Sequence, residues 1–252
     1  MTQPRARIGT SGWSYDHWAN GVFYPEGLLP ARRLEFYSSR FDTVEIDATF
    51  YRLPSAHAVE SWRDAVPANF VFAVKGSRLI THYRRLAGVD DALRSFLGRM
   101  ALLGDKLGVV LWQLPPNLHA DTGLLGRFLD LLPTEGPRHA VEFRHESWLA
   151  EKTFAVLAAH GVAHVHVSSD IMPASLIPTA DFVYARFHGT ASYHGAYTRP
   201  ALEPWARFLA EQVESGRDAY GYFNNDAEGY APRDAARLIG MLGPTASSSA
   251  NM

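Results

Sequence analysis

The chain has 252 residues, of which 47% are hydrophobic and 20% are charged, and it contains no cysteine. This composition supplies enough apolar surface for a sizeable core, and it excludes a disulfide framework, a thiolate nucleophile and a zinc–thiolate site. The 24 basic and 26 acidic residues give a formal net charge of -2, which offers no global attraction to nucleic acid or to an anionic membrane. Because there is no apolar run of membrane-spanning length and residues 1–7 are polar, we expect a cytoplasmic protein without a membrane partner.

Eight apolar runs, each ending on charged or hydrogen-bonding residues, follow one another along the chain. They cover residues 5–10, 43–47, 71–75, 108–113, 139–144, 164–168, 182–188 and 219–224. Apolar and polar residues alternate with a period of two, which is typical of strands whose successive side chains leave opposite faces. In the fifth run, Val141 and Phe143 therefore point one way, while Ala140, Glu142 and Arg144 point the other.

Apolar residues at helical spacing occupy most of the gaps between these runs. The predicted helices cover residues 30–40, 57–65, 90–103, 122–132, 149–160, 202–215 and 232–242. The sixth gap, between Ser168 and Asp181, is too short for a regular helix with flanking loops, and it contains Pro173 and Pro178. We therefore expect the sixth helix to be short or irregular.

Alternation of eight strands with helices in about 250 residues is typical of a closed (β/α)8 barrel. An open dinucleotide-binding sheet is disfavoured, because the first strand ends in Gly9–Ser14, which lacks the G-x-G-x-x-G spacing. The prediction is an α/β fold with one TIM-barrel domain over residues 5–243. The small polar residues of 244–252 predict a disordered tail.

Seven short motifs lie at or just after the predicted strand ends. They are Ile8–Tyr15, Thr49–Tyr51, Ile80–His82, Gln113–Pro116, Val141–His145, Arg186–Gly189 and Tyr222–Ala227. In this order, over about residues 7 to 242, they resemble the motifs of the DUF72 family, also called the YecE-like proteins. The resemblance implies a TIM barrel from a bacterial or archaeal family of unknown biochemical function. Asp47 departs from the pattern, since the resemblance leads us to expect asparagine there, and it adds an anion.

The C-terminal ends of the strands in a TIM barrel form one face, where active sites lie. The period-two assignment places one group of polar side chains around that opening, namely Glu45, Lys75, Gln113, Glu142, Arg144, Arg186, His188 and Asn224. Further candidates lie on adjoining loops, namely Trp13, Tyr15, Trp148, Asp170, Tyr193, Tyr197, Asn225 and Asp226. Anions and cations nearly balance among them, which favours a mutually paired network over a purely basic phosphate site.

Three functions agree with these residues, and we favour an enzyme. In the first, Glu142 or Glu45 acts as base and His188 as acid, while Lys75, Arg144 and Arg186 hold a small anionic or polyhydroxy substrate. Hydrolase, lyase and isomerase chemistry all stay open. The further candidate substrate-binding residues are Gln113, Asn224, Asn225, Asp226, Tyr193, Tyr197, Trp13, Tyr15 and Trp148.

The second function is that of a metal-dependent, endonuclease-like barrel. It would use a divalent metal held by Glu45, Glu142, Asp170 and His188; no other cofactor is evident. The third is a non-catalytic barrel that binds a sugar or a nucleic acid, with aromatic side chains of the loops as stacking platforms, namely Trp13, Tyr15, Trp18, Tyr51, Trp148, Tyr193 and Tyr197. Against all three stands the structural alternative that the buried charges are struts closing the barrel. The sequence defines no oligomeric state.

Overall fold

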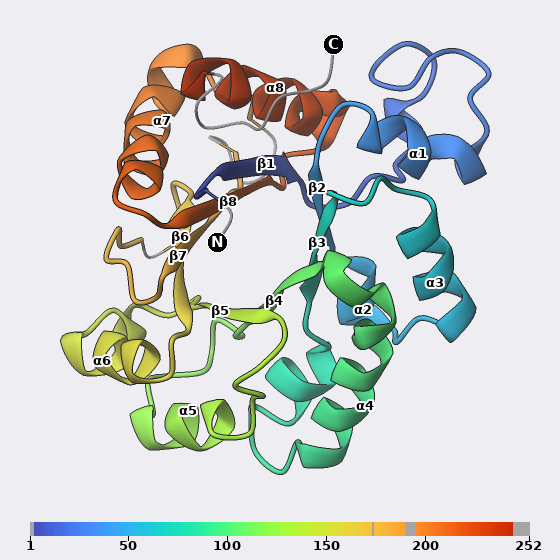
Figure 1. The fold of residues 1–252 in the computed structure, drawn as a ribbon. Helices are drawn as coiled ribbons and strands as arrows, with labels where there is room; N and C mark the ends of the chain where they lie inside the picture. The colour runs from blue at the N-terminus through green and yellow to red at the C-terminus, as the bar shows by residue number, and fades with distance from the viewer. Residues whose placement is uncertain (1–2, 173, 190–194, 244–252) are drawn as a thin grey trace.

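Eight parallel strands form the centre of the molecule, and helices surround them (Figure 1). The computed structural model describes residues 3–172, 174–189 and 195–243. The strands are β1 (Ala6–Thr10), β2 (Thr43–Ile46), β3 (Val71–Lys75), β4 (Leu107–Gln113), β5 (Arg138–Glu142), β6 (Ala163–Ser168), β7 (Phe182–Phe187) and β8 (Asp218–Phe223). All eight lie where the period-two pattern predicts them, so the TIM-barrel prediction is confirmed. The predicted tail, 244–252, lies outside the described residues.

The α-helices of the outer layer, apart from α2, are also close to their predicted positions. They are α1 (Arg33–Ser38), α2 (Ala48–Tyr51), α3 (Ala56–Asp64), α4 (Asp90–Met100), α5 (Thr122–Leu129), α6 (Glu151–Ala159), α7 (Arg199–Glu214) and α8 (Tyr230–Leu242). Between β6 and β7 the described residues form no helix, which confirms the irregular sixth connection; Pro173 itself is not among them. No helix in the described ranges combines the length and the apolar character needed to cross a membrane.

Single helical turns occupy several of the connections. The 3-10 turns are η1 (Asp16–Trp18), η2 (Pro30–Arg32), η4 (Ala101–Lys106), η5 (Glu146–Trp148) and η6 (Ala227–Gly229), and η3 (Leu79–Tyr83) is a π-helical turn. The sequence pattern did not predict α2 or η3, because each is barely one turn long and shows no helical periodicity. Both follow directly on strand ends, so they carry side chains to the rim of the barrel.

Two apolar cores lie on the two sides of the sheet. The barrel interior is filled by alternate strand residues, including Ala73, Leu111 and Ala140, while the outer core packs the opposite faces of the strands against the helices. Val141 and Phe143 belong to the outer core, as their period predicts. Toward the C-terminal ends of the strands, the next inward-facing residues are polar, and these side chains form the mouth of the barrel.

The barrel closes between β1 and β2, where the Tyr37 side chain takes the place of a continuous backbone hydrogen-bond ladder. In the ladder order β1-β8-β7-β6-β5-β4-β3-β2, the two outermost strands share one isolated bridge, between Ser11 and Glu45. Below it the Tyr37 hydroxyl accepts a hydrogen bond from the Thr10 amide at 2.9 Å and lies 3.1 Å from the Thr43 carbonyl oxygen. A β-carbon on Gly9 would lie only 2.3 Å from that carbonyl oxygen, so this approach requires glycine. The closure holds Ser11 beside Glu45.

Candidate active site

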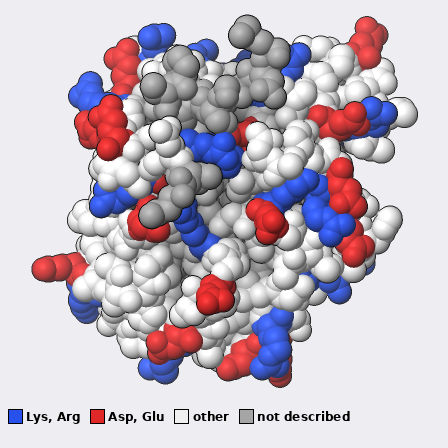
Figure 2. Space-filling view, viewed as in Figure 1, with Lys and Arg blue, Asp and Glu red and all other residues white. Residues whose placement is uncertain are grey.

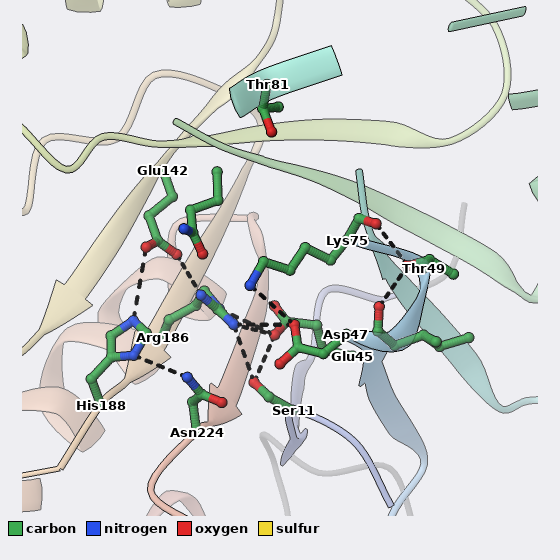
Figure 3. Close-up of polar contacts among 12 residues, drawn as sticks. Ser11, Glu45, Asp47, Thr49, Lys75, Thr81, Glu142, Arg186, His188 and Asn224 are labelled. Carbon is green, nitrogen blue, oxygen red and sulfur yellow. Dashed lines mark hydrogen bonds and ion pairs between the residues drawn. The ribbon is translucent and has the colours of Figure 1, made fainter. Parts of the chain in front are cut away.

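Arg186 is the centre of the polar network at the mouth (Figure 3). It lies on β7, is fully buried, and donates from Nη2 to Oε1 of Glu45 at 2.6 Å and from Nη1 to Oε2 of Glu142 at 2.7 Å. Glu45 lies on β2 and Glu142 on β5, so one guanidinium joins three strands across the barrel. Buried charges are tolerated when they are paired and hydrogen-bonded, and here they are.

Two hydroxyl groups complete the surroundings of Glu45. Ser11 Oγ donates to Oε1 at 2.6 Å, and the Tyr184 hydroxyl donates to Oε2 at 2.5 Å. Neither Ser11 nor Tyr184 was among the site residues predicted from the sequence. Signals for both were present, because Ser11 lies in the first family-like motif and Tyr184 shares the inward face of β7 with Arg186. Glu45 therefore has protein partners on both oxygens and is a structural member of the network.

The two buried carboxyl groups differ in their proton affinity. Burial favours the neutral form of Glu142, but Arg144 and Arg186 outweigh it and hold the pKa of this carboxyl well below its usual range. Burial raises the pKa of Glu45, and Asp47 adds to the effect while Arg186 opposes it. Glu142 is thus the firmly ionised carboxylate at the mouth.

His188 lies beside Glu142 as a neutral imidazole. Burial, followed by the positive charge of Arg186, lowers the pKa of His188 well below its usual value. The Asn224 amide nitrogen lies 3.2 Å from Nδ1, and since an amide nitrogen only donates, Nδ1 is the acceptor. The proton is therefore on Nε2, which lies 3.9 Å from Oε1 of Glu142. At this distance the imidazole and the carboxylate interact electrostatically, without a hydrogen bond between them.

Lys75 and Arg144 form an upper layer that retains contact with solvent. Lys75 Nζ lies 3.5 Å from Oδ1 of Asp47 and 4.6 Å from the centre of the Phe50 ring. Arg144 Nε donates to Glu142, and its Nη2 donates to Oε1 of Gln113 at 3.3 Å. The Lys75 and Arg144 side chains are 10% and 12% exposed, whereas Arg186 is completely buried. An anion entering the mouth would meet these two cations first.

His82 is a mouth residue that the sequence analysis did not select. It lies half-buried on η3, with Nδ1 2.9 Å from the buried Thr81 hydroxyl. Burial lowers the pKa of His82, and the nearby charges of Lys75 and Arg144 lower it further. The motif Ile80–His82 was visible in the sequence, but only as part of the family resemblance, because it lies beyond the end of β3, where the period-two pattern no longer gives the direction of a side chain.

The structure does not bring three predicted residues into the mouth as free groups. Trp148 is fully buried, donates from Nε1 to the Leu118 carbonyl at 2.7 Å and stacks on Phe143, so its prediction as a stacking platform is wrong. The Tyr197 hydroxyl lies 2.9 Å from Ser168 Oγ. The Asn225 amide nitrogen donates to Asp234 at 2.9 Å. Tyr197 and Asn225 are buried and hold loops together.

The predicted metal ligands are not gathered into one site. Glu45 and Glu142 both bind Arg186, and Asp170 is exposed on the connection after β6. Within the described ranges, no three His, Asp or Glu side chains form a group that could hold a metal ion. The paired network that the charge count predicted takes the place of a ligand set.

The remaining loop candidates lie around the rim. Trp13 makes an edge-to-face contact with Trp62, and the Tyr15 hydroxyl donates to the Ser11 carbonyl at 2.6 Å. The Asp226 carboxylate lies 3.6 Å from Nε2 of His17. Tyr193 lies outside the described residues. In the view of Figure 2, basic and acidic side chains are interspersed among uncharged ones, in keeping with the balanced composition.

Comparison with known proteins identifies one family whose model matches most of the chain. The family model described as "Protein of unknown function DUF72" matches residues 7–251. The chain is 26% identical to the UPF0759 protein YunF of Bacillus subtilis (strain 168), over 93% of this chain and 94% of YunF. It is 33% identical to the UPF0759 protein YecE of Escherichia coli (strain K12), over 57% of this chain and 50% of YecE. The crystal structure of a DUF72 family protein from Thermotoga maritima MSB8 superimposes with a TM-score of 0.86 and 29% identity, covering 94% of this chain and 99% of that one.

Proposed function

The chain belongs to the DUF72 family, whose function is unknown, and from its mouth we propose an enzyme that acts by acid–base chemistry on a small anionic or polyhydroxy substrate. One observation carries the proposal. Two partly exposed cations, Lys75 and Arg144, lie above a buried network that contains an ionised carboxylate beside a neutral imidazole. A structural strut needs no such exposed cations or neutral histidine.

The proposed roles follow from protonation states. Lys75 and Arg144 hold the anionic group, since a guanidinium suits carboxylate and phosphate oxygens. His188 is the base at Nδ1, where a substrate group replaces the Asn224 amide, and the charge of Glu142 stabilises the imidazolium that forms when Nδ1 takes a proton. The lowered pKa of His188 keeps the ring unprotonated, which disfavours the acid role that the sequence suggested. Glu142 is disfavoured as the base because Arg144 and Arg186 donate to its two oxygens. The Gln113 and Asn224 amides are suited to bind hydroxyl groups of the substrate.

Ligand-induced thermal stabilisation tests the binding half of the proposal. The panel contains inorganic phosphate, sulfate, phosphosugars, sugar acids and the matching neutral sugars. A ligand at a hundred times its Kd stabilises the fold by about 2.7 kcal/mol, a shift that melting curves resolve. We expect anions to stabilise the wild type, and Lys75→Met and Arg144→Gln to weaken this. The matched control is Arg94→Gln, because the Arg94 side chain is 76% exposed on α4, away from the mouth.

Turnover of the stabilising ligands, followed by proton NMR, tests the chemical half. His188→Gln and Glu142→Gln should abolish turnover, and His188→Gln should still be stabilised by the anion. The proposal is wrong if no anion in the panel stabilises the wild type. It is equally wrong if Arg144→Gln and Lys75→Met respond to every anion as Arg94→Gln does.

A further inference from the structure

A cavity adjoins the mouth on its β1–β2 side. It has a volume of about 540 Å³ and lies between α1, α3 and the end of β2. Its wall is mostly apolar, and it includes the rings of Trp13, Tyr15 and Trp62. A volume of roughly 300–1,000 Å³ with an apolar wall and few polar groups is the usual form of a small-molecule site. The polar mouth chemistry makes no use of this cavity.

The aromatic side chains of the cavity are placed to receive a flat ring. The Trp13 and Trp62 rings meet edge to face, with centroids 5.7 Å apart and an interplanar angle of 82°. Both are half-buried, unlike Trp112 and Trp148, which are completely buried in the outer core. An edge-to-face pair leaves ring faces open for a third aromatic partner, and aromatic groups prefer such offset or perpendicular contacts.

Asp47 connects this cavity with the mouth. It lines the cavity, and its Oδ1 lies 3.5 Å from both Lys75 Nζ and Arg186 Nη2 (Figure 3). At that length the cations neutralise Asp47 without a good hydrogen bond, and no described residue donates one to Oδ1. Its side chain is 21% exposed. A hydroxyl or N–H group of a ligand that passes from the mouth into the cavity could donate to this carboxylate.

The charged residues of the cavity and of the mouth indicate how a ligand that spans both would be oriented. Among the described residues that line the cavity, Asp47 and the Tyr15 phenol are the only ionisable acids or bases, so the cavity disfavours an anion. Lys75 and Arg144, on the other side of Asp47, favour one. We propose that the substrate has three parts: an anionic group at Lys75 and Arg144, a hydroxyl-bearing linker at Asp47, and a flat aromatic ring in the Trp13–Trp62 cavity. This inference rests on the proposed anion site and extends it to a ligand class of nucleotide-like form.

A graded series of ligands tests the three parts by calorimetric titration. Inorganic phosphate supplies the anion, ribose 5-phosphate adds the linker, and adenosine 5′-monophosphate adds the ring. Stacking of one base on protein aromatic groups corresponds to an affinity gain of about ten-fold or more. We expect adenosine 5′-monophosphate to bind at least about ten-fold more tightly than ribose 5-phosphate, with quenching of tryptophan fluorescence.

Two variants remove the ring site in different ways. Trp62→Leu removes one wall, and Ser61→Phe fills the cavity from an exposed helix position without deleting a packed side chain. Either variant should reduce the ten-fold difference to less than about two-fold. The control is Trp205→Phe, since Trp205 is also half-buried but packs on Phe187 and does not line the cavity.

The outcomes separate the two proposals. If ribose 5-phosphate binds in an Arg144-dependent way and the ring adds nothing, the aromatic site is refuted and the proposed function stands. If the ring adds affinity that survives both Trp62→Leu and Ser61→Phe, the assignment to this cavity is refuted. If binding depends on Trp62 but not on Arg144, the anion site and the proposed function are refuted together with the three-part ligand.

Discussion

Replacing Arg186 with methionine should destabilise the protein severely. The substitution keeps an unbranched, apolar stem but removes the guanidinium, the cation shared by two fully buried carboxylates. Removing one partner of a buried ion pair costs roughly 3–5 kcal/mol, because it leaves an uncompensated charge. Glu142 keeps Arg144 as a partner, so the loss falls mainly on Glu45, which keeps only two hydroxyl groups. We therefore expect a loss of about 4 kcal/mol at pH 7.

The sign of the pH dependence makes this prediction sharper. Burial already raises the pKa of Glu45, and without Arg186 the opposing attraction is gone. A folded-state pKa above the unfolded value means that the carboxyl contributes stability at low pH, and that this contribution is lost as the pH rises through the folded pKa. The loss of stability caused by Arg186→Met should therefore be smaller at pH 5 than at pH 8. Urea unfolding followed by circular dichroism measures both values.

Two further variants decide whether Arg186 acts through Glu45. Adding Glu45→Gln to Arg186→Met removes the stranded charge and should restore at least about 2 kcal/mol, measured as a double-mutant cycle. Arg94→Met, at an exposed arginine on α4, should change stability by no more than about 0.5 kcal/mol. The reasoning is refuted if Arg186→Met costs less than about 1 kcal/mol, or if its effect does not grow with pH.

Two predictions concern stability away from the mouth. Burial lowers the pKa of His164 to about 3, so its neutral form stabilises the fold above the unfolded pKa, and this stability is lost as the pH falls. At 1.36 kcal/mol per pKa unit the loss is about 2 kcal/mol between pH 7 and 5, and His164→Phe should remove it in urea titrations. Gly9→Ala should destabilise by roughly 3 kcal/mol or more, since the new β-carbon would overlap the Thr43 carbonyl oxygen. Gly98→Ala, in an open position on α4, should instead stabilise the protein by about 0.5–1 kcal/mol. Equal changes in melting temperature for the two variants would contradict the closure described for β1 and β2.

The fold was predictable because the sequence of each strand shows the alternation of apolar and polar residues by itself. Alternation in a run such as Val141–Arg144 defines both the strand and its inward face, and eight such runs separated by helical spacing leave few architectures. The same logic explains what was missed. The two single turns α2 and η3 are set by tertiary contacts, such as the Thr49 hydroxyl donating to the Lys75 carbonyl at 2.7 Å, and local sequence spacing does not encode these.

Placement of the site residues was predictable only as far as the strands continue. Glu45, Glu142 and Arg186 belong to strands, and the period-two pattern brought them together correctly. Trp148 lies beyond the strand, on η5, where the chain turns its ring outward onto Phe143 rather than toward the mouth. The sequence of a loop has no periodicity that indicates where its side chains point. Counting every polar or aromatic residue near a strand end therefore overestimates the number of site residues.

The pairing within the network also bears on why the mouth could serve catalysis. A count of anions and cations predicted that they would neutralise one another, but it did not distinguish a dispersed set of pairs from one shared cation. In the structure Arg186 binds Glu45 and Glu142 at once, which fixes the floor of the mouth from three strands. A rigid floor keeps Glu142 ionised and oriented beside His188 without reorganisation when charge develops, and such preorganisation is a large source of catalytic stabilisation. The same residues can therefore be both the strut and the support of the proposed chemistry, and variants of Lys75 and Arg144, which lie above the floor, separate the two roles.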